Sequence, residues 1–75
     1  MFVPSEQPHR RLLGDAVRAK RVAKEFSQEK LAEKAGLSTV FISRIERGIE
    51  SPSFDSLVKI AKALGVRVRD LVVRI

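Results

Sequence analysis

The residues from position 39 to position 47 carry side chains that could hold and read a nucleic acid. Ile42 and Ile45 are three positions apart, which predicts the inner face of a short helix. The outward positions are then Thr39, Val40, Ser43 and Arg44, with Arg47 one turn further. A helix that enters the major groove of DNA reads base edges with outward side chains of this kind. The outward residues are of types that could make such contacts.

The chemistry of the outward side chains determines what each could recognise. Arg44 could donate two hydrogen bonds to O6 and N7 of a guanine, and Thr39 can donate or accept one. Val40 can make only apolar contact, so a thymine methyl group is its natural target. Phe41 leaves three possibilities open: it could pack on the scaffold, lie against sugar or thymine, or be partly buried. Arg44 could also be an ordinary solvated arginine.

Two short helices joined by a tight turn would position these side chains. Ser27 is a candidate N-cap of the first helix, because its hydroxyl can accept from a free backbone N–H group. Gly36 can end that helix, since glycine adopts the left-handed conformation without strain. Leu37 then fills the corner and Ser38 caps the second helix. Helices of about eight residues are unstable alone in water, so the remaining chain must supply a core.

This ordered set resembles the helix-turn-helix of the phage repressor and Cro family, which includes the controller proteins of restriction–modification systems. The resemblance covers roughly Leu13 to Leu71. It implies an all-α fold, a compact bundle of five short helices whose second and third members form the helix-turn-helix. The matching residues are Ser27-Gln28-Glu29, Leu31-Ala32, Gly36-Leu37-Ser38, Ile42-Ser43, Ile45-Glu46-Arg47-Gly48 and Pro52-Ser53.

The resemblance also assigns expected roles to single residues. It places base reading on the four outward residues Thr39, Val40, Ser43 and Arg44. It places Gln28 at a DNA phosphate, where the first turn of a helix also offers free N–H groups. It implies a structural ion pair between Arg21 and Glu46.

Two further residues, Ser38 and Arg47, are candidate phosphate contacts, and Ser43 could also serve in this way. Arg47 could instead be neutralised by Glu50 or Glu46. The sequence leaves both possibilities open.

Hydrophobic periodicity predicts one helix on each side of the helix-turn-helix. The first spans about 11–24 and has an inner stripe of Leu13 and Val17, with Ala16 as a further candidate. Phe26 follows as an expected core residue. The second helix follows Ser53 and ends at Gly65. Its inner face is expected to consist of Phe54, Leu57, Ile60, Ala61 and Leu64.

The segment 66–75 is ambiguous. Its alternation of valine and arginine from Val66 to Arg69 is typical of a strand. The resemblance implies a short helix instead, usually capped by a serine where this chain has Arg67. We predict a helix from Val68 to Val73, because Leu71 then faces the core and a lone strand would have no partner.

The chain of 75 residues is expected to form one domain, residues 10–75, preceded by an arm. Residues 1–9 show no periodicity and are interpreted as a flexible N-terminal arm. The alternative is an arm that reaches DNA or a partner subunit, with Arg10 and Arg11 touching phosphate.

Composition narrows the classes of function. The net charge of +6 and pI near 10.6 favour an anionic partner, and double-stranded DNA is the usual one. With no cysteine and one histidine, the chain offers no cysteine-based or multi-histidine metal site. We found no catalytic set, so we expect no enzyme, no cofactor and no small-molecule substrate. No apolar run approaches a membrane span and no signal-peptide core is visible, so we expect a cytoplasmic location.

Taken together, these features predict a sequence-specific DNA-binding transcriptional regulator that acts as a homodimer on a two-fold symmetric operator. The expected dimer interface is the apolar cluster Leu71, Val72, Val73 and Ile75. Two alternatives stay open. One is an antitoxin-type autoregulator that also binds a toxin, and the other is a protein-binding adaptor that keeps the fold. Salt-dependent binding to random duplex DNA would separate the adaptor from both DNA binders.

Overall fold

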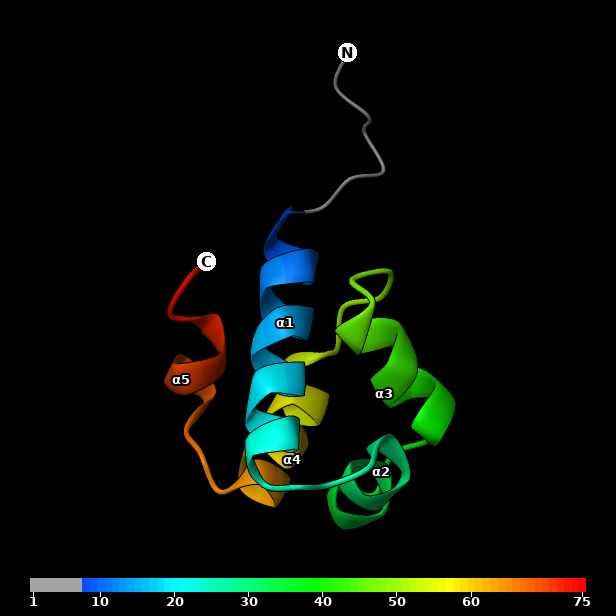
Figure 1. The fold of residues 1–75 in the computed structure, drawn as a ribbon. Coiled ribbons are helices and arrows are strands. Elements are labelled where there is room, and N and C mark those ends of the chain that lie inside the picture. The colour runs from blue at the N-terminus through cyan, green and yellow to red at the C-terminus, as the bar shows by residue number, and fades with distance from the viewer. Residues whose placement is uncertain (1–7) are drawn as a thin grey trace.

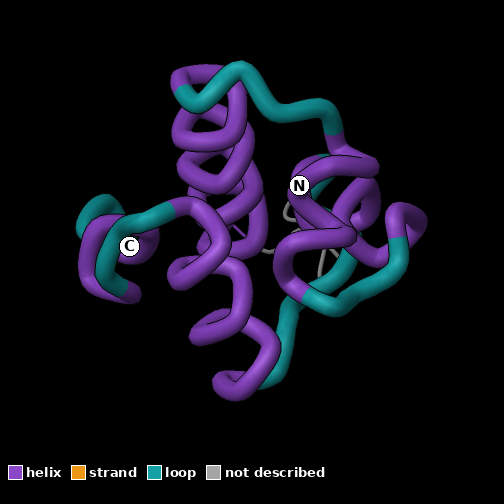
Figure 2. The backbone as a smooth tube through the Cα atoms, turned by 90° about the horizontal axis from the view of Figure 1, so that it is seen from below, coloured by secondary structure: helices purple, strands orange, loops and turns teal. Residues whose placement is uncertain are grey.

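The computed structural model describes residues 8–75, which fold into five α-helices (Figure 1). None of these residues lies in a strand, and Figure 2 shows only helices joined by loops in the described part of the chain. The predicted all-α bundle is therefore confirmed. The helices are α1 (Pro8–Ala23), α2 (Gln28–Ala35), α3 (Thr39–Glu46), α4 (Phe54–Leu64) and α5 (Val68–Val72).

Three serines begin helices at the positions where the sequence places caps. The hydroxyl oxygens of Ser27, Ser38 and Ser53 accept hydrogen bonds from backbone N–H groups three residues further on, at 2.9, 3.1 and 3.1 Å. Each bond satisfies a donor that the first turn of a helix leaves free. Gly36 ends α2 with φ 70°, the left-handed conformation that glycine adopts without strain. Ser27, Gly36 and Ser38 thus fix both ends of α2 and the start of α3.

The core lies where α1 meets the other helices. α1 runs through the middle of the bundle, with α3 on one side and α5 on the other, and it also contacts α4 (Figure 1). α2 packs against α3 and α4. The apolar residues buried between the helices are Leu13, Val17, Leu31, Ala32, Ala35, Ile42, Ile45, Leu57, Ile60, Ala61, Leu64 and Leu71.

One expected core residue is exposed, and one expected interface residue is buried. Phe54 is 69% exposed, because it is the first residue of α4 and lies before the helix has turned its apolar face inward. Leu71 is only 1% exposed, so it faces the core as predicted and is not available for the dimer interface to which it was also assigned. Phe26 is half-buried against the core.

The C-terminal segment is helical, which excludes the strand interpretation. α5 spans Val68–Val72 and ends one residue before the predicted boundary. Arg67 stands at its N-cap, where it has no hydroxyl or carboxylate to accept from the first turn. The Asp70 carboxylate instead accepts from the Arg67 backbone N–H at 2.9 Å, which is the reciprocal half of a capping box. Asp70 therefore helps the helix to begin without a serine.

The start of α1 also differs from the prediction. α1 begins at Pro8 rather than near Arg11, so Pro8 and His9 are helical and do not belong to an arm. Proline is suited to this place, because the first turn needs no backbone N–H donor. The rest of the expected arm, residues 1–7, lies outside the described residues.

A glycine that the sequence analysis overlooked sets the distance between α1 and α3. Gly14 is buried, and a Cβ atom at this position would lie 2.3 Å from the carbonyl oxygen of Ile45 and 2.8 Å from that of Glu46. Contacts this short cannot form, so only glycine permits the observed crossing of the two helices. This close approach brings α1 within reach of the side chains at the end of α3.

Candidate nucleic-acid interface

The outward face of α3 combines exposed and half-buried side chains. Ile42 and Ile45 are 0% exposed and hold the helix to the core. Val40 is 60% exposed and Arg44 is also exposed, whereas Thr39 and Ser43 are half-buried. The four predicted base-reading residues therefore share one helix face, and Val40 and Arg44 are the exposed ones among them.

Phe41 is half-buried and packs against the core. Of the three possibilities that the sequence left open, the structure shows partial burial. This placement leaves Val40 as the exposed apolar residue in the first turn of α3.

Arg44 and Glu50 form a loose ion pair at the surface. Their Nη1 and Oε1 atoms are 3.7 Å apart, and the two side chains are 53% and 39% exposed. This distance is too long for a good hydrogen bond, and exposed pairs of this kind contribute little stability. The Arg44 guanidinium can therefore exchange Glu50 for another acceptor at low cost.

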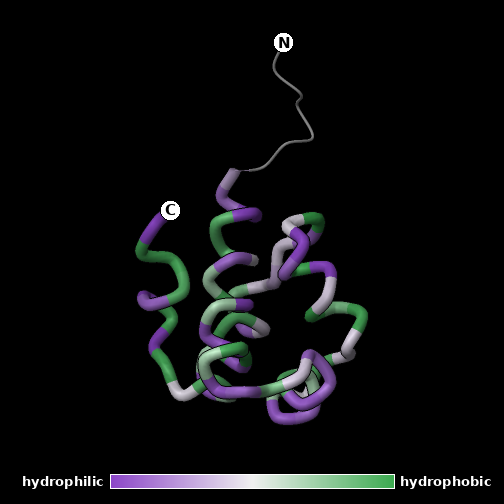
Figure 3. The backbone as a smooth tube through the Cα atoms, viewed as in Figure 1, coloured by the Kyte–Doolittle hydropathy of each residue, from purple (hydrophilic) through white to green (hydrophobic). Residues whose placement is uncertain are grey.

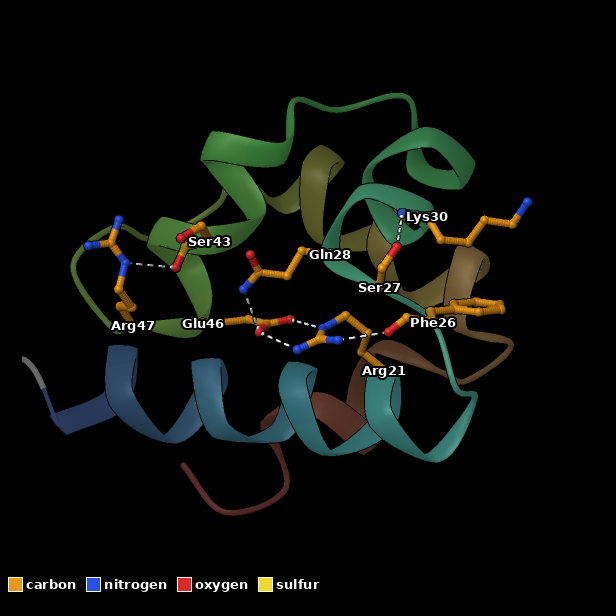
Figure 4. A network of polar contacts seen from close by, with 8 residues as sticks. All are labelled: Arg21, Phe26, Ser27, Gln28, Lys30, Ser43, Glu46 and Arg47. Atoms are coloured by element: carbon orange, nitrogen blue, oxygen red, sulfur yellow. Dashed lines mark hydrogen bonds and ion pairs between the residues drawn. The ribbon is translucent and has the colours of Figure 1, made fainter.

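Arg47 follows α3 and folds back on it. Its Nε donates to the Ser43 carbonyl oxygen at 3.4 Å, as Figure 4 shows. Glu46 is paired with Arg21 and Glu50 with Arg44, so the structure does not show the neutralisation of Arg47 that the sequence left open. Arg47 is exposed and keeps its charge at the end of the candidate reading helix.

Behind this face, the buried carboxylate of Glu46 connects α3 with α1 and α2 (Figure 4). Arg21 on α1 binds Glu46 on α3 with two hydrogen bonds, Nε to Oε2 at 2.6 Å and Nη2 to Oε1 at 3.0 Å. The Arg21 Nη1 also donates to the Phe26 carbonyl oxygen at 2.7 Å. The side chains of Arg21 and Glu46 are 13% and 3% exposed. The ion pair that the resemblance implied is thus present in the structure.

Gln28 is also part of this network, a link that the sequence analysis missed. Its Nε2 donates to Glu46 Oε1 at 3.0 Å, from the first residue of α2. The family resemblance predicts Gln28 only as a phosphate contact and Glu46 only as the partner of Arg21. Both residues match the family pattern in the sequence. Their contact could not be predicted from that match, because it depends on how α2 and α3 cross.

Ser38 has a structural role that bears on its candidate contact with phosphate. Its oxygen already accepts from the Phe41 backbone N–H at 3.1 Å, so it serves as the N-cap of α3. A hydroxyl also has one donor, which remains compatible with a phosphate oxygen.

The start of α1 lies beside the loop that follows α3. A Cβ atom at Gly48 would be 3.1 Å from the Cα of Arg11 and 3.6 Å from the carbonyl carbon of Arg10. Two arginines at the beginning of α1 are thereby brought close to the C-terminal end of α3, which carries Arg47. The fold thus places the backbone of Arg10 and Arg11 beside this end of the candidate reading helix.

The described residues contain no group of three or more His, Cys, Asp or Glu side chains that could hold a metal ion. In the same part of the chain, no helix is long and apolar enough to cross a membrane.

Comparison with known proteins identifies the fold. The sequence pattern of the helix-turn-helix family HTH_3 matches residues 17–71, from the middle of α1 into α5. The chain belongs to this family. Its relatives include a control protein, the immunity repressor of a Bacillus phage and an HTH-type transcriptional regulator.

Two controller proteins are similar to this HTH_3 chain. The control protein C.BamHI from Bacillus amyloliquefaciens is 49% identical over 63 residues, which are 83% of this chain and 78% of that protein. The crystal structure of the restriction–modification controller C.AhdI from Aeromonas hydrophila has a TM-score of 0.85 and 34% identity, covering 87% of this chain and 98% of that one.

A third similar protein was solved with DNA. The biofilm master regulator SinR in complex with DNA has a TM-score of 0.76 and 37% identity, over 79% of this HTH_3 chain and 95% of that one. Several other curated relatives are longer proteins, and the chain spans less than half of their length.

Proposed function

We propose that this HTH_3 protein is a sequence-specific DNA-binding transcription regulator that acts as a homodimer on a two-fold symmetric operator. The observation that supports this most directly is the exposed face of α3, where Val40 and Arg44 extend from a helix anchored by a buried ion pair. The net charge of +6 favours approach to a polyanion. The likeness to SinR, solved in complex with DNA, supports the same proposal.

In this proposal, α3 lies in the major groove and reads bases with Thr39, Val40, Ser43 and Arg44. Arg44 leaves Glu50 and donates both prongs of its guanidinium to a guanine, since their 3.7 Å contact is easily replaced. Val40, which is 60% exposed, contacts a thymine methyl group.

Phosphate contacts flank the reading helix and set its register before any base is read. We assign them to Gln28 at the start of α2, to Ser38 at the start of α3 and to Arg47 at its end. Gln28 would donate its second amide N–H to a phosphate oxygen, and Ser38 would donate its hydroxyl hydrogen. Arg47 would attract a phosphate through its positive charge. These three contacts bracket α3 along its length.

We assign the dimer interface to the exposed apolar residues of the C-terminal segment. Val73 is 78% exposed, Ile75 is 59% exposed and Val72 is half-buried. Figure 3 shows a hydrophobic stretch in this part of the tube, flanked by hydrophilic ones. A pocket of about 220 Å³ lies beside it, between α1 and α5. Its lining contains both acidic residues, Asp15 and Asp70, and basic residues, Lys20 and Arg74, so a second copy related by a two-fold axis could pair opposite charges.

Selection of bound sequences from a random duplex pool tests this proposal. The expected product is an inverted repeat whose half-sites are about 10 base pairs apart, centre to centre. Affinity for random duplex should fall steeply with salt, because phosphate contacts release counterions. Absence of salt-dependent binding to any duplex would contradict the proposal. Selection of a single half-site without symmetry would contradict the homodimer.

A further inference from the structure

We infer that Glu46 is a positioning residue for DNA binding, which orients the Gln28 amide toward the phosphate backbone. This inference rests on the proposed function, because it needs Gln28 to be a phosphate contact. It assigns the buried Glu46 a second role besides its ion pair with Arg21.

The hydrogen bonds of Glu46 determine which way the Gln28 amide faces. Only the nitrogen of the amide can donate to a carboxylate, and it does so at 3.0 Å. A flipped amide would place its carbonyl oxygen against the Glu46 carboxylate, where two acceptors repel. The amide nitrogen therefore stays at the network and keeps one N–H for another acceptor.

Glu46 itself has little freedom to move. Two hydrogen bonds from Arg21 hold both of its oxygens, and its side chain is 3% exposed. Arg21 is fixed in turn by the Phe26 carbonyl oxygen at 2.7 Å. Figure 4 shows the chain of contacts running from Phe26 through Arg21 and Glu46 to Gln28. A rigid support of this kind lowers the entropy that Gln28 loses when it binds a phosphate.

Electrostatics and positioning predict opposite effects on DNA affinity when the Glu46 carboxylate is removed. Removing a negative charge near the DNA should strengthen binding, because it raises the net charge of the protein. Loss of positioning should weaken binding. The substitution Glu46→Gln therefore separates the two effects by the direction of the change.

The experiment is a double-mutant cycle with Glu46→Gln and Gln28→Ala, using the selected operator and random duplex as probes. Binding is measured at a temperature where circular dichroism shows every variant to be folded. We expect Glu46→Gln to weaken binding to both probes by about tenfold, as for one lost hydrogen bond to a charged group. In the Gln28→Ala background the same substitution should not weaken binding. Glu33→Gln, which removes an exposed carboxylate, supplies the effect of charge alone.

Arg21→Lys keeps the experiment informative if Glu46→Gln is too unstable. Lysine retains a charge for Glu46 but loses the two-pronged contact, so stability should fall while Gln28 stays anchored and binding changes less than about twofold. Equal weakening by Glu46→Gln in both backgrounds would overturn the inference, as would tighter binding. If the parent binds DNA but Gln28→Ala has no effect, the inference fails and the proposed function stands. If the parent binds no duplex, the proposed function itself fails.

Discussion

At the scale of single residues, a buried carboxylate must have a partner for each of its oxygens. Glu46 meets this condition with three hydrogen bonds from two residues, Arg21 and Gln28. Buried ion pairs add little net stability compared with apolar residues, but a charge left alone in the interior is costly. Each member of the network therefore depends on the others.

The first prediction concerns the stability of this network. Glu46→Gln keeps the shape of the side chain but leaves the Arg21 guanidinium without a counter-charge. Since Arg21 is 13% exposed and some water reaches it, we expect a loss of about 3 kcal/mol, the low end for a broken buried pair. Urea denaturation measures the change. The exposed Glu33, whose side chain is 76% exposed, provides the control, and Glu33→Gln should change stability by less than about 0.5 kcal/mol.

The second prediction separates base reading from phosphate contact on α3. Arg44→Ala should cost about 1–3 kcal/mol of binding free energy and relax the preference at one base pair of each half-site. Arg47→Ala should weaken all sequences alike and lower the salt slope by roughly one per subunit. Titrations on the operator, its single-base variants and random duplex at several salt concentrations measure both effects. If Arg44→Ala weakened every sequence equally, Arg44 would be a phosphate contact.

At the scale of the helices, much of the fold follows from local chemistry. The serine caps and Gly36 place the ends of α2 and α3 within the predicted limits, because their effect is confined to one turn. The start of α1 and the exposure of Phe54 were less predictable. The first residues of a helix can lie before its apolar face meets the core. Hydrophobic periodicity does not show where along the helix this contact begins.

The candidate site was predictable only where it depends on a single helix or on the family resemblance. The helical period identified the outward face of α3, and the family resemblance identified Arg21 and Glu46. The contacts between elements were not visible in the sequence. Gln28 meets Glu46, Arg44 meets Glu50 and Gly14 meets the backbone of α3 only because the helices cross as they do.

The third prediction tests that crossing. Gly14→Ala would normally stabilise a helix by about 1 kcal/mol through its propensity. Here the added Cβ would lie 2.3 Å from the Ile45 carbonyl oxygen, so α1 and α3 must move apart. We expect a net loss of about 1–3 kcal/mol in urea denaturation, as for other overpacked sites.

Gly36→Ala is the comparison for this change. Its Cβ would have no neighbour within 4 Å, so it reports only the cost of a left-handed alanine, about 1–2 kcal/mol. A shift of the backbone amide resonances on both α1 and α3 should accompany Gly14→Ala alone. A Gly14→Ala protein as stable as the parent would show that the two helices separate without cost.

At the scale of the whole molecule, some apolar residues of the C-terminal segment are buried in the core and others are exposed at the surface. Leu71 completes the core at 1% exposed, and Val73 and Ile75 remain at the surface at 78% and 59% exposed. In the proposed function, a monomer offers one short reading helix, which would contact few base pairs. Pairing two copies would cover the exposed residues and bring two reading helices to one operator.

The last prediction tests this pairing. Val73→Lys places a charge in the proposed interface but leaves the core untouched, so the protein should stay folded and lose self-association by more than about tenfold. Sedimentation over a range of concentrations measures the loss. Ile49→Lys is the control for self-association, because Ile49 is an apolar, 57% exposed residue in the loop between α3 and α4, outside the proposed interface. Val73→Lys should also weaken binding to the complete operator far more than to a single half-site, since only the complete operator benefits from the linked second subunit. A parent protein that sediments as a monomer both free and on the operator would contradict the dimer, and Val73 and Ile75 would then be an ordinary exposed surface.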